Sequence, residues 1–232
     1  MTSESLHGAL RTSATLMVLL AMLLANPSFA ELKGPEPKAL LHNQHLSFDV
    51  YFNDRRVGEH VFELAHDHDG QTRVRSMASF TARLLFVPVY RYQHQASESW
   101  KAGCLQALTA VTDDNGTQFE VSMQRKADQL VISQSAPDVL TTQIAAPCPA
   151  TYAYWDLALL RRAQLINAQT GSVDDSKLIE RGIESLDGVP ARRFTLESQE
   201  GSIELWYRAS DLQWIGLRSA QNGGTLSYRP AS

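Results

Sequence analysis

The chain has 232 residues, of which 44% are hydrophobic and 20% charged, and its formal net charge at pH 7 is −4. This length suits one large domain or two small ones, and no segment looks like a linker between two. The acidic balance and the lack of a basic stripe argue against nucleic acid as a partner.

The first 30 residues have the organisation of a cleavable secretory signal peptide. Arg11 precedes an apolar run from Leu16 to Ala25, and Pro27 and the small residues Ser28 and Ala30 follow. A membrane-spanning helix needs about 20 apolar residues, so this run is too short to stay in the membrane. We expect cleavage after Ala30 and a periplasmic or secreted protein without stable membrane insertion.

After the leader, the chain divides into an arm and one β domain. Residues 31–45 show no periodicity and predict an extended N-terminal arm, whereas residues 46–232 predict a single antiparallel β domain. From Leu46 the apolar residues alternate with polar ones, which is the period of a half-buried strand. Turn signals separate the later strands, expected near 57–64, 72–82, 89–101, 104–112, 117–124, 129–134, 176–182, 191–198, 202–208, 213–219 and 225–229.

One segment departs from the strand period. Between Thr151 and Gln164, the residues Tyr154, Leu157 and Leu160 recur at nearly helical spacing, and Thr151 is a suitable N-cap. The sequence therefore predicts one short helix there.

These elements predict an all-β, mainly antiparallel fold of about a dozen strands. An open sheet of that size curls, so we expect a barrel, a half-barrel or a strongly wrapped sheet with the helix plugging or flanking it. Such a sheet encloses an interior, which either side chains or a ligand fill.

Cys104 and Cys148 are the two cysteines of the chain. Export would bring both into an oxidising compartment, so a disulfide between them is the favoured prediction. It would close a loop of about 45 residues and contribute about 3 to 4 kcal/mol on the chain-entropy model. Two separate buried thiols are the alternative.

The predicted strand from Tyr90 to Lys101 has two very different faces. Its outward face is polar, which turns His94 and Glu98 inward among aromatic side chains. Four residues of strand separate His94 from Glu98 by about 13 Å, so each needs a partner from another strand, and His60 is one candidate. The row is either a paired structural network or the lining of a polar cavity.

Other aromatic residues are candidates for the wall of such a cavity, with ordinary core packing as the alternative. The complete set of candidate cavity residues is His60, Tyr90, Tyr92, His94, Glu98, Trp100, Trp155 and Trp206.

Motifs with stronger chemical meaning are missing. The sequence has no Gly-x-Ser-x-Gly elbow, no phosphate-binding glycine loop and no His-Glu-x-x-His. The hairpin tip His66-Asp67-His68-Asp69 offers imidazoles and carboxylates but not four converging ligands, so we expect neither a metal nor a cofactor.

Several segments occur in a fixed order along the chain: Phe48-Asp49-Val50-Tyr51, Val57-Gly58-Glu59-His60, Tyr90-Arg91-Tyr92-Gln93-His94, Glu98-Ser99-Trp100, Thr112-Asp113-Asp114-Asn115-Gly116, Tyr154-Trp155, Asn167-Ala168-Gln169-Thr170-Gly171 and Leu205-Trp206-Tyr207. Through these segments the chain resembles an exported bacterial family, domain of unknown function 6134, over about residues 46–228. The resemblance implies an exported β-rich protein without an assigned reaction, and the family's pattern Gly58, His60, His94, Glu98 and Trp100 is intact.

The leading functional hypothesis is a non-enzymatic binding or envelope-support protein whose curved sheet holds an apolar, lipid-like or amphipathic molecule. Two alternatives remain: an enzyme that uses Glu98 or His94 as a general base, and a purely structural interaction module.

Overall fold

The computed structural model describes residues 40–84, 86–135, 140–144, 148–199, 201–221 and 223–231. They belong to one compact unit within residues 38–232. The predicted signal peptide, its cleavage site and residues 31–39 of the predicted arm lie outside the described residues.

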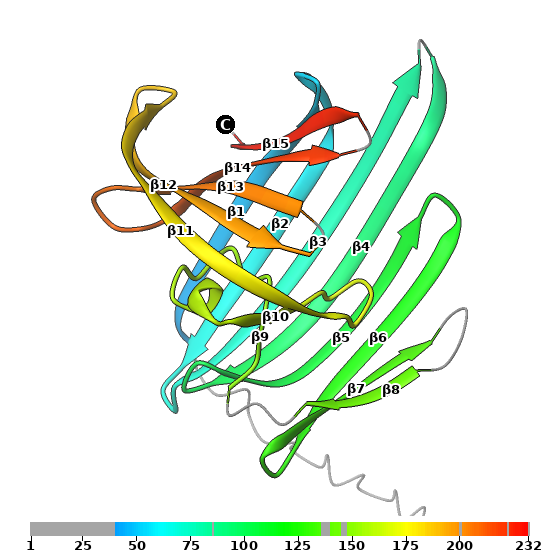
Figure 1. The fold of residues 1–232 in the computed structure, drawn as a ribbon, viewed down its shortest axis with the longest axis vertical. Coiled ribbons are helices and arrows are strands. Elements are labelled where there is room, and N and C mark those ends of the chain that lie inside the picture. Colours follow the sequence, from blue (N-terminus) through cyan, green and yellow to red (C-terminus); the bar gives the residue numbers. More distant parts are fainter. Residues whose placement is uncertain are drawn as a thin grey trace, which may run out of the picture. The chain divides into compact units, whose positions relative to one another are not determined.

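Within these residues, fifteen strands form one curled sheet (Figure 1). Its order is β8-β7-β6-β5-β4-β3-β2-β1-β15-β14-β13-β12-β11-β10-β9, so the first and last strands are neighbours at its centre. Neighbouring strands are antiparallel except for β9 and β10. The edge strands β8 and β9 do not pair with each other, so the sheet curls without closing.

The bounds of the strands are β1 Leu40–Phe52, β2 Arg55–Asp67, β3 Gln71–Leu84, β4 Val87–Lys101, β5 Cys104–Asp114, β6 Thr117–Lys126, β7 Gln129–Ser135, β8 Leu140–Ile144, β9 Ala150–Thr151, β10 Gln164–Ile166, β11 Val173–Leu186, β12 Val189–Ser198, β13 Gly201–Arg208, β14 Trp214–Gln221 and β15 Gly224–Pro230. The twelve strands expected from the sequence are all present, and β8, β9 and β10 are additional. β1 begins at Leu40 and not at Leu46, so the end of the predicted arm is part of the sheet.

The alternation in the sequence sets which side chains fill the concave face. In β1, Leu46, Phe48 and Val50 are buried. Phe48 packs against Trp214 of β14, with ring centroids 4.2 Å apart, because β1, β15 and β14 are adjacent. The two halves of the sheet therefore share one apolar core.

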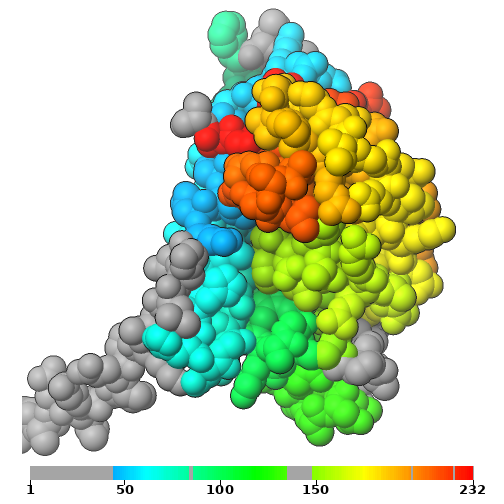
Figure 2. Space-filling model, turned by 90° about the vertical axis from the view of Figure 1, so that its left-hand side faces the viewer, coloured from blue at the N-terminus to red at the C-terminus, as the bar shows by residue number. Residues whose placement is uncertain are grey.

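The segment 150–166 lies against this concave core, but it is not the predicted α-helix. It contains β9, a single turn of 3₁₀ helix at Leu159–Arg161, and β10. Leu157, Leu160 and Leu165 are buried in the main core. Figure 2 shows these yellow-green residues between the cyan and green strands of the first half and the orange and yellow strands of the second.

Competing hydrogen bonds explain why the helical spacing does not yield a helix. The carbonyl oxygen of Tyr154 accepts a hydrogen bond from the Tyr207 hydroxyl (2.8 Å), and the Asp156 carboxylate accepts one from the Ala158 amide (2.8 Å). Such contacts offer the backbone an alternative to the helical ladder. In the described part of the chain, no helix is long and apolar enough to cross a membrane.

The predicted disulfide between Cys104 and Cys148 is present, with the Cα atoms 4.6 Å apart. Cys104 begins β5, and Cys148 comes two residues before β9. The bond therefore fastens the segment 150–166 to the start of β5.

Candidate functional site

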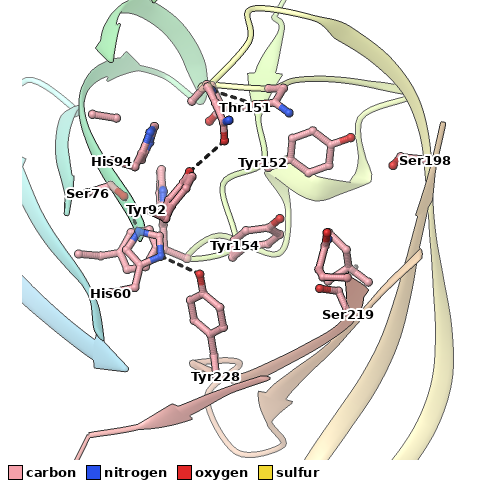
Figure 3. Close-up of a pocket in the computed structure, with 18 of the residues that line it drawn as sticks. His60, Ser76, Tyr92, His94, Thr151, Tyr152, Tyr154, Ser198, Ser219 and Tyr228 are labelled. Atoms are coloured by element: carbon pink, nitrogen blue, oxygen red, sulfur yellow. Dashed lines mark hydrogen bonds between the residues drawn. The ribbon is translucent and has the colours of Figure 1, made fainter. Parts of the chain in front are cut away.

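A cavity of about 390 Å³ lies between the concave face of the sheet, the segment 150–166 and the loop that follows it. One wall comes from β2, β3 and β4, and the opposite wall from β12–β15. Figure 3 shows His60, Ser76 and His94 on one side of the space, and Ser198 and Ser219 on the other. The exposed residues Ser202 and Ala220 lie at the rim.

Part of the row predicted to point inward on β4 reaches the cavity. Tyr92, His94 and Glu98 line the cavity, whereas Gln93 and Gln95 between them are exposed. Because alternate residues of a strand point to the same face, the titratable groups of His94 and Glu98 both face the interior.

Glu98 lines the cavity and has two hydrogen-bond partners. Its carboxylate accepts hydrogen bonds from the Trp100 indole (2.8 Å) and the Thr151 hydroxyl (3.0 Å). Burial raises the pKa of Glu98 to about 7, although these two hydrogen bonds act to lower it. Near neutral pH the carboxyl group can therefore donate or accept a proton.

The two histidines have hydroxyl partners. His60 Nδ1 lies 3.1 Å from the Tyr228 hydroxyl and His60 Nε2 lies 2.7 Å from Ser76 Oγ. His94 Nδ1 lies 2.8 Å from Thr112 Oγ1.

Both imidazoles are neutral at physiological pH. Burial, together with the nearby His94, lowers the pKa of His60 to about 3, and burial lowers the pKa of His94 to about 4. Neither histidine bonds to Glu98, so the predicted histidine and carboxylate groups each find separate partners.

A chain of hydrogen bonds fixes the loop after β10 against β4. The Tyr92 hydroxyl donates to Gln169 (3.0 Å), Gln169 donates to Asp114 (3.2 Å), and the Tyr90 hydroxyl donates to the other oxygen of Asp114 (2.7 Å). Asn167 turns this loop by accepting the amides of Gln169 and Thr170. The loop therefore forms an anchored side of the cavity.

Five of the eight predicted cavity residues line the space: His60, Tyr92, His94, Glu98 and Trp155. The other three do not line it. Tyr90 lies beyond the cavity on Asp114, and Trp100 is buried in the core behind Glu98.

Trp206 belongs to a separate apolar cluster with Ala191 and Ile215, and its indole donates to Glu184 (2.7 Å). In the run Leu205-Trp206-Tyr207 all three side chains are buried, so hydrophobicity alone does not reveal that Trp206 belongs to a different cluster from its neighbours.

Most polar residues of the cavity were not predicted. Ser198, Ser219 and Tyr228 stand on β12, β14 and β15, which reach β2–β4 only because β15 pairs with β1. The segment from Asn167 to Gly171 belongs to the family pattern quoted above, and that was the available signal for the loop.

The side chains of His66 and Asp67 make hydrogen bonds within the β2–β3 hairpin. Asp67 accepts the amides of Asp69 (3.0 Å) and Gln71 (2.8 Å), and His66 bonds to Thr72 (2.9 Å). Among the described residues, no group of three or more His, Cys, Asp or Glu side chains is arranged to hold a metal ion.

The fold is similar to that of a solved beta-barrel-like protein of domain of unknown function DUF1849 from Brucella abortus. The TM-score is 0.60 and the sequence identity 10%, and the match covers 84% of this chain and 98% of that one. At this identity the similarity shows the fold alone. No curated protein sequence matches the chain.

The family comparison agrees with the resemblance seen in the sequence. Residues 48–231 match the family described as Domain of unknown function (DUF6134). This range contains the end of β1 and all of the other strands. The chain belongs to this family.

Proposed function

We propose that the chain is an exported binding protein whose cavity holds an uncharged amphipathic molecule. The observation that carries this proposal is the lining: hydroxyl, amide and imidazole groups alternate with aromatic and aliphatic side chains, and the described residues around the space include no Lys, Arg or Asp. Glu98 is the one acidic residue among them, and Trp100 and Thr151 already donate hydrogen bonds to its carboxyl group. A buried ionic ligand would need an opposite charge there.

The charge state of the lining supports a neutral ligand. His60 and His94 stay uncharged because burial lowers their pKa values to about 3 and about 4. Ser76, Ser198 and Ser219 add hydroxyl groups that both donate and accept hydrogen bonds. Such a lining suits the hydroxyl, ester or amide groups of a neutral molecule.

The apolar part of the ligand would lie against the aromatic wall. Tyr152, Tyr154 and Trp155 belong to residues 150–166, which we call the inner segment, and they line the same space as Phe62 and Val74 of the sheet. The volume, about 390 Å³, lies in the range of small-molecule sites. It suits a small amphiphile or one end of a larger lipid.

Native mass spectrometry of protein recovered from its own host tests this proposal. We expect an additional lipid-sized mass that leaves on denaturation. The Ser202→Trp variant at the rim should lose it, whereas Ser210→Trp, an exposed serine of the β13–β14 turn, should keep it. Ligand-free spectra of the wild-type protein, or equal retention by both variants, would contradict the proposal.

A second candidate, a hydrolase, rests on the 2.7 Å contact between His60 Nε2 and Ser76 Oγ inside the cavity. A serine beside a histidine is the arrangement of an activated nucleophile. Two features favour binding instead. Burial lowers the pKa of His60 to about 3, which makes it a weak base. Ser76 lies in β3, which is paired with β2 on one side and β4 on the other, and not on a loop. Labelling of Ser76 by a fluorophosphonate probe would support the hydrolase, and we expect none.

A further inference from the structure

The hairpin between β3 and β4 extends beyond its neighbours. β2 accompanies β3 only as far as Phe80, and β5 accompanies β4 only from Tyr92. The Arg91 carbonyl still accepts a hydrogen bond from the Asn115 amide. Beyond Phe80 and Arg91, the described residues of the two strands pair with each other alone. We call residues 81–84 and 86–90 the β3–β4 overhang, and its tip projects at the upper end of the sheet in Figures 1 and 2.

The overhang exposes large apolar side chains. Phe86 is 93% exposed, Val87 64% and Val89 55%. These three residues lie within four positions of a projecting tip and form an exposed apolar surface. Proline at position 88 has no backbone N–H, so it leaves no unpaired donor there. A projecting tip of this kind fits into a fluid apolar phase rather than into a packed core.

Unpaired positive charge accompanies these residues. Arg83 and Arg91 are exposed and make no ion pair with any described residue. By contrast, Arg56 of β2 and the residues Arg73 and Arg75 in the first half of β3 each face a carboxylate. The sequence from Thr81 to Arg91 contains no acidic residue. The overhang itself therefore carries basic and no acidic side chains, and Asp114 of β5 lies at its base, hydrogen-bonded to Tyr90.

The order of these groups along the hairpin matches a lipid interface. At about 3.3 Å per residue, Arg83 lies roughly 7 to 10 Å behind Phe86, and Tyr90 and Arg91 lie farther back. Peripheral segments insert their apolar side about 5 to 10 Å into a bilayer, with cations at the headgroups and tyrosine at the boundary.

We propose that the β3–β4 overhang docks on the surface of an anionic lipid bilayer, with Phe86 and Val87 among the acyl chains and Arg83 and Arg91 at the headgroups. This surface is distinct from the cavity and does not depend on the proposed ligand. Docking there would place the Tyr92 side of the cavity, which follows Arg91 on β4, near the source of a membrane-derived amphiphile.

Vesicle flotation tests the docking. The compact unit lies within residues 38–232, so a chain that begins at Glu31 contains all of it without the apolar leader. We expect this protein to float with vesicles of mixed phosphatidylglycerol and phosphatidylcholine, and less with phosphatidylcholine alone. Phe86→Ser should weaken the partition about tenfold or more, because a buried phenyl side chain contributes at least that factor.

The matched control is Ile183→Ser in β11, which removes an apolar side chain that is 72% exposed but lies on another hairpin. It should float like the wild type, and Arg83→Gln with Arg91→Gln should remove the preference for phosphatidylglycerol. The proposal is overturned if the wild type does not float, if Phe86→Ser and Ile183→Ser behave alike, or if Phe86→Ser changes only the sedimentation coefficient, which would indicate self-association.

Discussion

Glu98 accepts a hydrogen bond from Thr151 across 3.0 Å, although the two residues lie 53 positions apart and their strands, β4 and β9, are not neighbours in the sheet. The contact joins the inner segment to the middle of the concave face. It also holds a carboxyl group at the wall of the cavity in a poorly hydrated position.

That position predicts a pH-dependent stability. The pKa of Glu98 rises on folding from 4.5 to about 7 because of burial, so the folded protein binds this proton more tightly than the unfolded chain. The contribution of Glu98 to stability therefore falls as the pH rises through this window. Glu98→Gln should gain about 3 kcal/mol relative to the wild type between about pH 4 and pH 8, measured by denaturant unfolding.

His60 and His94 act in the opposite direction, since their pKa values are lowered on folding to about 3 and about 4. The unfolded chain takes up these protons first, so stability also falls as the pH drops below about 6.5. Comparing the variant with the wild type cancels this histidine contribution. Glu63→Gln, a half-exposed carboxylate on β2, is the control, and a similar gain there would refute the assignment.

Gln169 anchors the loop that closes one side of the cavity. Gln169→Ala removes its hydrogen bonds to Tyr92 and Asp114, and it should cost about 1 to 2 kcal/mol and speed amide exchange in residues 167–172. Gln164→Ala removes a single exposed hydrogen bond to Asp175 and should change neither. Equal exchange in both variants would mean that the loop is held by other contacts.

Gly58 is required by close packing of β2 on β3. A Cβ atom at this position would overlap the carbonyl oxygen of Ser79 and lie 2.8 Å from the Phe80 Cα. We expect Gly58→Ala to cost about 3 kcal/mol or more by thermal or denaturant unfolding. At Gly70, an added Cβ meets open space and only the positive φ opposes it, so Gly70→Ala should cost about 1 kcal/mol.

The disulfide predicts a simple chemical result. No free thiol should react in the unfolded, unreduced protein, and replacing Cys104 and Cys148 with serine should lower stability by about 3 to 4 kcal/mol on the chain-entropy model. Because the bond fastens the inner segment, proteolysis of the double variant should begin between residues 148 and 166. First cleavage in the β-hairpins would argue against that role.

Local sequence pattern was sufficient for the strands. Leu46, Phe48 and Val50 alternate with polar residues, and turn residues such as Asn115 and Asp187, both with positive φ, separate the hairpins. The same reasoning placed His94 and Glu98 inside, because side chains of a strand alternate between two faces and the polar face of this strand is exposed to solvent.

Elements fixed by distant contacts could not be predicted in this way. The spacing of Tyr154, Leu157 and Leu160 looks helical because all three contact the main core. The backbone nevertheless takes a non-helical path, since the Tyr207 hydroxyl bonds to the Tyr154 carbonyl and the Asp156 carboxylate accepts the Ala158 amide. Ser219 and Tyr228 carry no local signal for the cavity, since only the pairing of β1 with β15 brings them there.

Trp155 gives the most direct test of ligand binding in the cavity, because it lines this space. Trp100 and Trp214 are buried behind the wall of the cavity, and Trp206 belongs to a separate cluster. We would titrate the protein with a brominated monoacylglycerol and follow tryptophan fluorescence. The account predicts saturable quenching at one equivalent that is reduced in Trp155→Phe and kept in Trp206→Phe. Absence of quenching in the wild type, or equal quenching in Trp155→Phe, would contradict it.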